Sequence, residues 1–222
     1  MLRNVRVWFK KHGDAIYISH LDLNRTMLRL IKRSDVSIWY TEGFSPHPYI
    51  TFPLPLSLGM IGLREPMDLR VTEEISNEEI FEKFKKADFS GIEILEVTDV
   101  MMKTNEICFA RYIVDFDFEG MKNKDALKLI ENIIEKNEEI PVEKKTKAGI
   151  KTIDLKEFLK DACFFIKDGY ISMNIVLPAG SVKNINPGLI IDGLAKKFNN
   201  NNKNIHNLIK VNMYNKEMKV FK

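Results

Sequence analysis

Apolar and polar residues alternate at the start of the chain, in "LRNVRVWFKK", so that Val5, Val7 and Phe9 share one side. A period of two is the pattern of a half-buried β-strand. The same pattern predicts strands in "PMDLRVTEEI" (66–75) and "GIEILEVTDV" (91–100). We expect a further extended run within residues 48–57, after the short extended piece "VSIWY".

Two segments between these strands have the period of a helix instead. "SNEEIFEKFKKADF" (76–89) predicts a helix capped by Ser76, and "ISHLDLNRTMLRLIKRSD" predicts one capped by Ser19, with Asp22 completing a weak capping box. On a wheel of 100° per residue, the apolar side chains of residues 21–33 fall on one half. The other half is a basic stripe of Arg25, Arg29, Lys32 and Arg33.

The resulting order, β-α-β-β-α-β, is the ferredoxin-like arrangement. The second half repeats it, with Asp168 and Gly169 at the turn of a hairpin and a short strand pair expected within 138–160. Its predicted elements are a strand at 110–120, a helix at 123–137, the hairpin at 163–178, a helix at 186–198 and a strand at 207–216. The sequence therefore predicts an α+β protein of two tandem ferredoxin-like subdomains with antiparallel sheets, 1–100 and 110–222.

The composition is that of a globular protein with a core, since 45% of the 222 residues are apolar and 29% are charged. No apolar run approaches the roughly 18–20 residues that span a bilayer, and the first residues do not resemble a secretion signal. Cys108 and Cys163 lie in apolar surroundings and far apart, which favours two buried thiols. We expect a cytoplasmic protein without a membrane segment, a metal or a cofactor of its own.

Charge is distributed unevenly along the chain. Residues 1–64 hold nine Lys and Arg against four Asp and Glu, whereas residues 65–119 hold six against fifteen. Residues 120–222 are basic again, with nineteen against twelve. A basic face of this kind suits a phosphate-bearing partner, although lysine-rich surfaces are common.

The segment "YTEGFSPHPYITFPLPLSLGM" (40–60) holds four of the eight prolines. Proline fixes φ and biases the preceding residue toward extended structure, so Pro46 and Pro48 predict a rigid element. We expect it to present Ser45, His47 and Tyr49 to a ligand, with Gly43 at a sharp turn. Phe52 alternates with apolar neighbours, which favours anchoring on the core.

The basic stripe and the histidines have competing interpretations. Arg25, Arg29 and Arg33 recur every four residues, and like charges at this spacing repel, so an anionic partner is slightly favoured over a merely solvated face. His20 and His47 are equally compatible with a functional pair, for proton transfer or weakly for a metal, and with structural roles, whereas Asp22 is better explained as a cap. His12 and His206 are expected at the surface. The sequence contains no P-loop, dinucleotide-binding, serine-hydrolase or zinc-protease motif.

The first third of the chain resembles a bacterial family of unknown function that is linked to radical-SAM enzymes. Its motifs have the forms K-x-G-x-x-x-Y-I-S-H-L-D-x-x-R, G-F-[NS]-P-x-P-x-I-x-F-x-x-P-L-x-x-G and E-x-x-D. The matching residues are Lys11, Gly13, Tyr17, Ile18, Ser19, His20, Leu21, Asp22 and Arg25, then Gly43, Phe44, Ser45, Pro46, Pro48, Ile50, Phe52, Pro55, Leu56 and Gly59, then Glu65 and Asp68.

The resemblance implies a partner rather than an activity. Members of that family are fused to, or encoded beside, radical-SAM proteins that bind cobalamin, and lie near genes for an E/G-type ribonuclease and large-subunit ribosomal proteins. This chain has no C-x-x-x-C-x-x-C cluster motif and no D-x-H-x-x-G cobalamin motif, so radical chemistry would belong to the partner.

The leading hypothesis is a non-catalytic accessory protein that binds RNA, or another anionic substrate, and works with a radical-SAM/cobalamin enzyme. Arg25, Arg29 and Arg33 would bind phosphate, and Ser45, His47 and Tyr49 would contact the substrate. Support for the site would come from Ser19, His20, Asp22, Gly43, Pro46, Pro48, Glu65 and Asp68.

Two alternatives remain open at this point. One is a metal-free endoribonuclease that resembles CRISPR repeat-processing proteins, with His20 or His47 as general base. The other is an adaptor that binds only protein.

Overall fold

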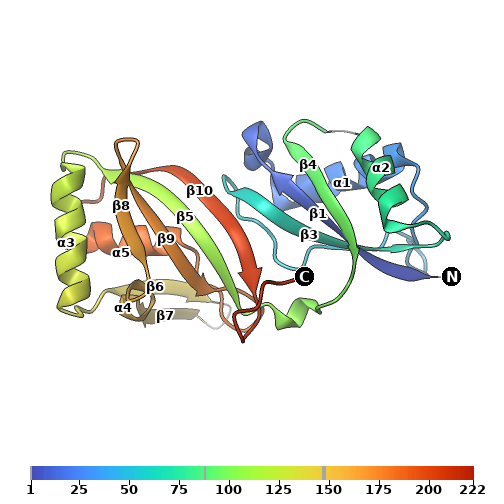
Figure 1. Ribbon diagram of the computed structural model, residues 1–222. Helices are drawn as coiled ribbons and strands as arrows, with labels where there is room; N and C mark the ends of the chain where they lie inside the picture. The colour runs from blue at the N-terminus through green and yellow to red at the C-terminus, as the bar shows by residue number, and fades with distance from the viewer. Residues whose placement is uncertain (1, 88, 147–148) are drawn as a thin grey trace. The chain divides into compact units, whose positions relative to one another are not determined.

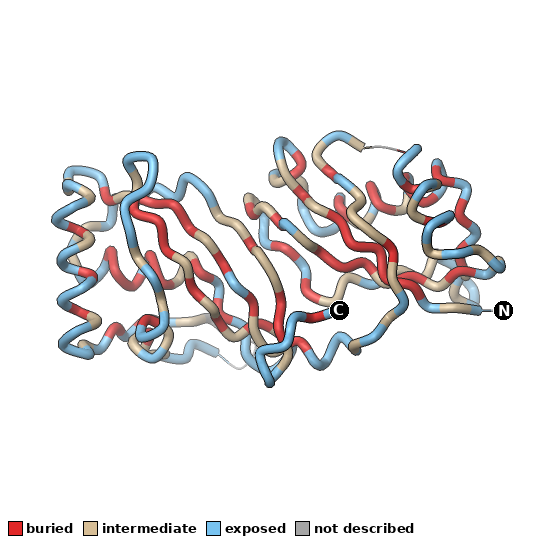
Figure 2. Tube along the Cα trace, in the orientation of Figure 1, coloured by how far each residue is buried: buried red, intermediate tan, exposed pale blue. Residues whose placement is uncertain are grey.

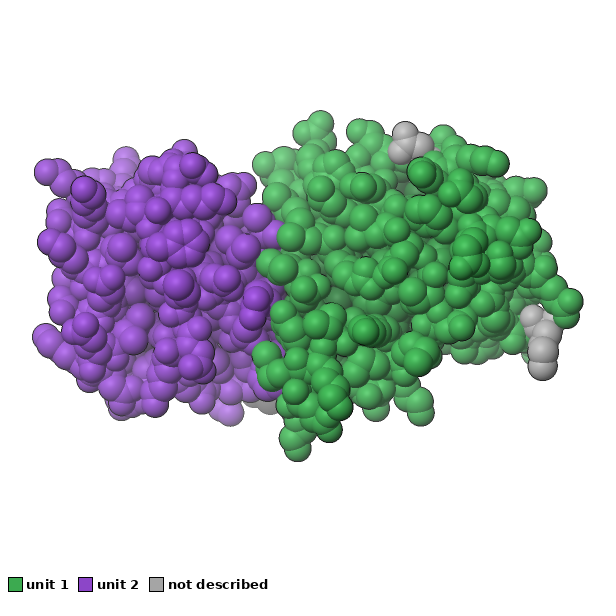
Figure 3. Space-filling model, in the orientation of Figure 1, with its two compact units in different colours: residues 1–108, 210–222 green, residues 109–209 purple. Residues whose placement is uncertain are grey.

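A computed structural model describes residues 2–87, 89–146 and 149–222. The chain forms two compact units, one of residues 1–108 and 210–222 and the other of residues 109–209 (Figure 3). These units are defined by how densely residues pack and not by independent folding. The predicted domains, 1–100 and 110–222, therefore stay a prediction.

The first unit combines antiparallel strands with the helices α1 and α2, as Figure 1 shows. Its strand order is β4-β1-β3, with β2 paired to β3 and the end of β10 also beside β3. β1 pairs antiparallel with both β3 and β4. The elements are β1 (Arg3–Lys11), η1 (Gly13–Tyr17), α1 (His20–Ser34), β2 (Ile50–Thr51), β3 (Ile61–Val71), α2 (Asn77–Ala87), β4 (Ile92–Asp99) and η2 (Thr104–Glu106).

The core of the first unit lies between the helices and one face of the sheet, here called the inner face. Val5 and Val7 from β1, and Met67 and Leu69 from β3, point to this face. Both helices cover it with their apolar sides, which for α1 comprise Leu23, Met27, Leu30 and Ile31. The alternation read in the sequence therefore places the core as expected, and the buried strands of this unit are visible in Figure 2.

The opposite, outer face of the sheet carries the polar positions of β1 and β3. Arg6 is fully buried there. Its charge is compensated, because the guanidinium donates to both oxygens of Asp68, at 2.6 and 2.8 Å. It also donates to the carbonyl oxygens of Lys222 (2.7 Å) and Met102 (3.0 Å). The ring of Phe221 lies 4.3 Å from the Arg6 guanidinium and packs edge-on against Trp8. The C-terminal segment thus covers part of the outer face.

The second unit contains a sheet of order β10-β5-β9-β8 and a separate β6-β7 hairpin. β5 pairs antiparallel with β9, and β9 with β8. α3 packs on β5, β8 and β9, and α5 lies close to β6 at Gly193. The elements are β5 (Phe109–Phe118), α3 (Asn123–Glu135), β6 (Pro141–Thr146), β7 (Gly149–Asp154), α4 (Lys156–Leu159), β8 (Cys163–Lys167), β9 (Tyr170–Pro178), α5 (Gly188–Lys197) and β10 (Lys203–Tyr214).

The predicted α+β class with mostly antiparallel pairing is confirmed, whereas several boundaries differ. β3 begins at Ile61 rather than at residue 66, and the extended run within 48–57 is only Ile50–Thr51. The expectation of two buried thiols was wrong, because Cys163 is exposed. It lies on β8, which is the edge strand of its sheet among the described residues. No helix in the described part of the chain is long and apolar enough to cross a bilayer.

Replacement of Arg6 by Met tests the buried network. Asp68 and two carbonyl groups would lose their donors, so we expect the free energy of unfolding to fall by about 3 kcal/mol in urea denaturation. Arg29→Met is the matched control, because Arg29 is exposed on α1, and should change stability by less than about 0.5 kcal/mol. Equal effects of the two substitutions would contradict the structural role assigned to Arg6.

Candidate functional site

The proline-rich segment begins with a hairpin, residues 39–49, that stands on the edge of the first unit's sheet. Its two arms are joined by backbone hydrogen bonds from Tyr49 N to Trp39 O (3.0 Å) and from Thr41 N to His47 O (2.9 Å). Tyr40 and Pro48 form a bridge between them. Trp39 N donates to Arg70 O, which attaches the hairpin to β3. The prolines therefore stiffen a projecting element, here called the Pro-rich hairpin.

His47 holds the hairpin in shape. Its Nδ1 lies 3.0 Å from Thr41 Oγ1 and 3.2 Å from Ser45 O, and its backbone N–H donates to Thr41 Oγ1. The tip contains Ser45 and Pro46, both exposed, and Gly43, whose φ of 122° is accessible mainly to glycine. Phe44 at the tip is fully exposed. An aromatic ring in this position is available to a partner.

His20 lies where the Pro-rich segment returns to the core. Its ring packs edge-on against Phe52 at 5.3 Å, and Phe52 packs against Phe9 in turn. Phe52 is thus the core anchor that the sequence predicts. Ser19 caps α1 by accepting from Asp22 N, and donates to the Asp22 carboxylate at 2.7 Å. The hydrogen bond from Ser19 lowers the pKa of Asp22. Asp22 thus takes part in the helix cap, as the sequence predicts.

The basic stripe lies on the solvent side of α1. Arg25 pairs with Asp22 at 3.1 Å, whereas Arg29 and Arg33 are exposed and have no ion pair within the described ranges. Because the other side of α1 covers the inner face of the sheet, the stripe points away from the sheet. It is therefore separated from the outer face by the whole thickness of the unit.

Arg70, on the outer face, lies against two aromatic rings that also contact each other. Its guanidinium carbon lies 4.9 Å from the centroid of Trp39 and 5.0 Å from that of Tyr49. The two rings meet edge-on at 5.6 Å, and Arg70 Nε donates to Asn4 Oδ1 at 2.9 Å. No carboxylate pairs with Arg70 among residues 2–87, 89–146 and 149–222. The cluster therefore presents an uncompensated positive charge beside two π-systems.

A hollow of about 210 Å³ opens next to this cluster and is here called the outer-face pocket. The lining residues of β1, β2 and β3 are here called its floor, and the others are Tyr49, just before β2, and residues of the chain that follows β4. Two predicted residues, Tyr49 and Asp68, line it. The full set is Asn4, Tyr49, Thr51, Asp68, Leu69, Val100, Lys103 and Thr104.

Glu65 is buried near the other end of β3, among lysines. Its carboxylate pairs with Lys210 at 2.8 Å, and Lys210 also donates to Leu54 O at 2.9 Å. Lys11 is buried and donates to Ile16 O, at 3.3 Å. Glu65 Oε1 lies against Gly62 and has no hydrogen-bond partner among the described residues. Lys210, on β10, thus connects the Pro-rich segment to Glu65 on β3.

Burial sets the protonation of this cluster. It raises the pKa of Glu65 to about 7, although Lys210 and Lys11 oppose that change. Burial also lowers the pKa of Lys11, against the attraction of Glu65. The raised pKa of Glu65 favours its protonated form more than that of an exposed glutamate, and its environment is structural rather than ligand-facing.

The predicted site residues separate into distinct places. Tyr49 and Asp68 share the outer-face pocket, Ser45 and His47 lie in the hairpin, and Glu65 is buried elsewhere. Sequence reasoning missed Arg70, Trp39, Asn4 and Lys103, because no local pattern indicated that they would meet. No group of three or more His, Cys, Asp or Glu in the described part of the chain could hold a metal ion.

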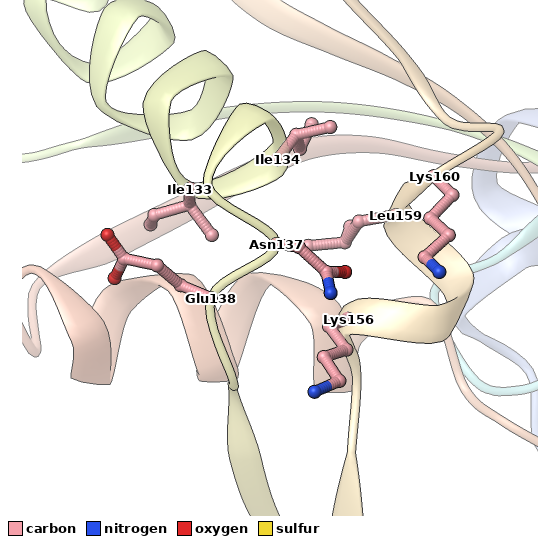
Figure 4. Close-up of a pocket in the computed structure, with 7 residues that line it drawn as sticks. All are labelled: Ile133, Ile134, Asn137, Glu138, Lys156, Leu159 and Lys160. Carbon is pink, nitrogen blue, oxygen red and sulfur yellow. The ribbon is translucent and has the colours of Figure 1, made fainter.

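Two other hollows contain none of the predicted residues. One of about 380 Å³ lies between α1, α2 and the start of β4, with His12 and Lys85 among its lining. The other lies between the end of α3 and α4 (Figure 4). Its volume of about 10 Å³ accommodates one water molecule at most, so it is no ligand site.

Comparison with known proteins places the chain in a family without a known activity. The family model described as "Uncharacterized protein conserved in bacteria (DUF2344)" matches residues 4–187, so the chain belongs to this family. No curated protein matches it. Among solved structures, an unknown protein from Galdieria sulphuraria is 11% identical, with 95% of this chain and 99% of that chain covered, at a TM-score of 0.26.

Substitution of Glu65 by Gln tests the protonation of the buried cluster. Between about pH 4.5, the ordinary pKa, and pH 7, the folded protein holds a proton that the unfolded chain has lost. The free energy of unfolding of the wild type should therefore fall as the pH rises through this interval. The glutamine amide of the variant cannot titrate, so the wild-type stability minus that of Glu65→Gln should decrease from pH 5 to pH 7.5 and then level off.

Urea denaturation at pH 5, 6, 7 and 8 measures this difference. Glu82→Gln is the control, since Glu82 is exposed on α2 and should show no such trend. A difference for Glu65→Gln that stays constant or increases with pH would exclude the raised pKa.

Proposed function

We propose that the protein is a non-catalytic accessory protein of the cytoplasm that binds single-stranded RNA on the outer face of its first unit. The observation that carries the proposal is the position of Arg70, against the rings of Trp39 and Tyr49 and without a carboxylate partner in the described structure. A guanidinium donates two hydrogen bonds to phosphate at once. Aromatic side chains beside such a cation are the usual platform for unstacked bases.

The charges around the pocket support an anionic ligand. Lys103 lines the pocket, is exposed, and has no ion pair within the described ranges. Asp68, the acidic residue of the lining, is already neutralised by Arg6. Arg29 and Arg33 on α1 supply a second exposed basic surface, as the sequence predicted, but on the opposite side of the unit. We assign the primary phosphate contacts to the outer face, because there, unlike on the basic stripe, an arginine without a carboxylate partner adjoins two aromatic rings.

We further propose that the protein works with a radical-SAM enzyme that binds cobalamin. The resemblance of the motifs supports this pairing, and exposed apolar side chains support contact with a protein. Phe44 at the hairpin tip is fully exposed, and Tyr17, Leu21 and Leu58 are each more than half exposed. These four belong to, or adjoin, the motif segments. The same observation supports the adaptor hypothesis as a second candidate.

The geometry does not favour the endoribonuclease alternative. His20 packs on Phe52, and His47 Nδ1 is bonded within its own hairpin. Neither side chain lines the outer-face pocket. A general base must reach the proton that it removes, whereas the His47 Nδ1 is already engaged within the hairpin.

We also propose that both units are variants of the ferredoxin-like fold. In the first unit the order β4-β1-β3-β2 supports this assignment, and in the second the order β10-β5-β9-β8 does. The β6-β7 hairpin and α4 would be an insertion between the first helix and the second strand of the second unit.

Arg70→Leu tests the RNA contact. Loss of one charged phosphate contact should weaken binding of a single-stranded 12-nucleotide RNA about tenfold at low salt. It should also reduce the salt dependence of log K by roughly 0.7, the share of one phosphate. Filter binding at two or more salt concentrations measures both quantities.

The matched control is Arg64→Leu on the same strand. Arg64 also stacks on an aromatic ring, Trp8 at 4.0 Å, but is paired with Glu96. Its loss should leave RNA affinity within twofold. Unchanged affinity in Arg70→Leu would refute the assigned surface, and weakening in Arg25→Ala/Arg29→Ala alone would move the site to the basic stripe.

Phe44→Ser tests the protein contact. The purified cobalamin-binding radical-SAM protein is added to nuclease-treated samples, and its co-purification is measured. We expect the variant to recover at least fivefold less of it, because a buried aromatic anchor contributes about 2 kcal/mol or more at many interfaces. RNA binding of the same variant should remain unchanged. Equal recovery of the partner with wild type and variant would exclude the hairpin tip as the contact.

A further inference from the structure

The outer-face pocket has the size of a single flat group. Its volume, about 210 Å³, is below the roughly 300 Å³ at which pockets for drug-sized ligands begin. The registers place its floor residues side by side: Thr51 lies opposite Asp68, and Asn4 lies opposite Arg70. Directly opposed residues of an antiparallel pair lie about 5 Å apart, so the polar groups are spaced on the scale of one ring system.

The floor offers both hydrogen-bond donors and acceptors. Asn4 Oδ1 is occupied by Arg70, which leaves the Asn4 amide N–H₂ available as a donor. The Asp68 oxygens each receive one hydrogen bond from Arg6, and a carboxylate oxygen has capacity for a second. Thr51 is exposed and supplies a hydroxyl. The edge of a nucleobase presents the complementary pattern of acceptors and donors.

The side wall is a ring that is fixed in place. Tyr49 meets Trp39 edge-on, lies against the Arg70 guanidinium, and is attached through its backbone N–H to Trp39 O. A ring that is packed against two side chains, on a backbone that is itself hydrogen-bonded, loses little conformational entropy when a base stacks on it. Lys103 also lines the pocket and supplies an ammonium group for an adjoining phosphate.

We infer that this pocket takes one unstacked base of a single-stranded RNA. Tyr49 stacks on the base, Asn4, Thr51 and Asp68 bind its edge, and Lys103 and Arg70 bind the phosphates on either side. This inference rests on the proposed RNA binding, but adds that binding depends on the base and not on charge alone.

The experiment compares an intact RNA with an abasic strand of the same length, which keeps every phosphate but has no bases. Fluorescence anisotropy with labelled nonamers of U, A and C gives the affinity of each. For wild type we expect the best intact strand to bind at least tenfold tighter than the abasic strand, because stacking of one base on an aromatic side chain is worth roughly 1–3 kcal/mol.

Variants of Tyr49 locate this base dependence. Tyr49→Leu should weaken the intact strand about tenfold and leave the abasic strand unchanged. Tyr49→Phe keeps the ring and its packing on Trp39, and should bind nearly as wild type. Tyr40→Leu is the matched control, because Tyr40 is an exposed tyrosine of the same hairpin that does not line the pocket.

The failures of the two proposals are distinguishable. If intact and abasic strands bind wild type equally, or if Tyr49→Leu weakens both by the same factor, RNA binding stands and the base pocket is refuted. If wild type binds neither strand at low salt, both proposals are refuted.

Discussion

A buried guanidinium needs a hydrogen-bond acceptor for its N–H groups. In this protein that requirement organises the outer face of the first unit's sheet. The four acceptors of Arg6 come from three places far apart in the chain: Asp68 on β3, Met102 after β4, and Lys222 in the C-terminal segment. Removal of any of them would leave an expensive unpaired donor. The network therefore fixes the C-terminal segment over Trp8 and leaves the Asn4 and Tyr49 side uncovered, where the pocket lies.

Three arginines on this face differ in one respect, and that difference defines the candidate site. Arg6 is paired with Asp68, and Arg64 with Glu96, so both are close to neutral as units. Arg70 has rings and an amide but no carboxylate in the described structure. All three guanidinium groups lie over aromatic rings, so stacking alone does not distinguish them. What distinguishes Arg70 is a charge that remains for a ligand.

The sequence predicted what local periodicity determines. Alternation placed Val5 and Val7 on the core side of β1, and Ser19 was recognised as the cap of α1 because capping is decided within four residues. Arg6 shows where that reasoning ends. Its position in the alternation indicates an outward side chain, which is correct, but its burial depends on Phe221 and Lys222, which lie at the far end of the chain. The Glu65 and Arg70 clusters also depend on residues distant in the sequence. No pattern near Lys210 or Trp39 indicates that these residues contact Glu65 and Arg70.

The division of the chain has a consequence for biosynthesis. The first unit consists of residues 1–108 together with residues 210–222, and all residues of the second unit are translated between these two parts. While the ribosome is still making the second unit, β3 lacks β10, Glu65 lacks Lys210, and the guanidinium of Arg6 lacks one of its carbonyl acceptors. The N-terminal unit would therefore be the last to reach its final packing, and the second unit, although made later, would be free to fold first.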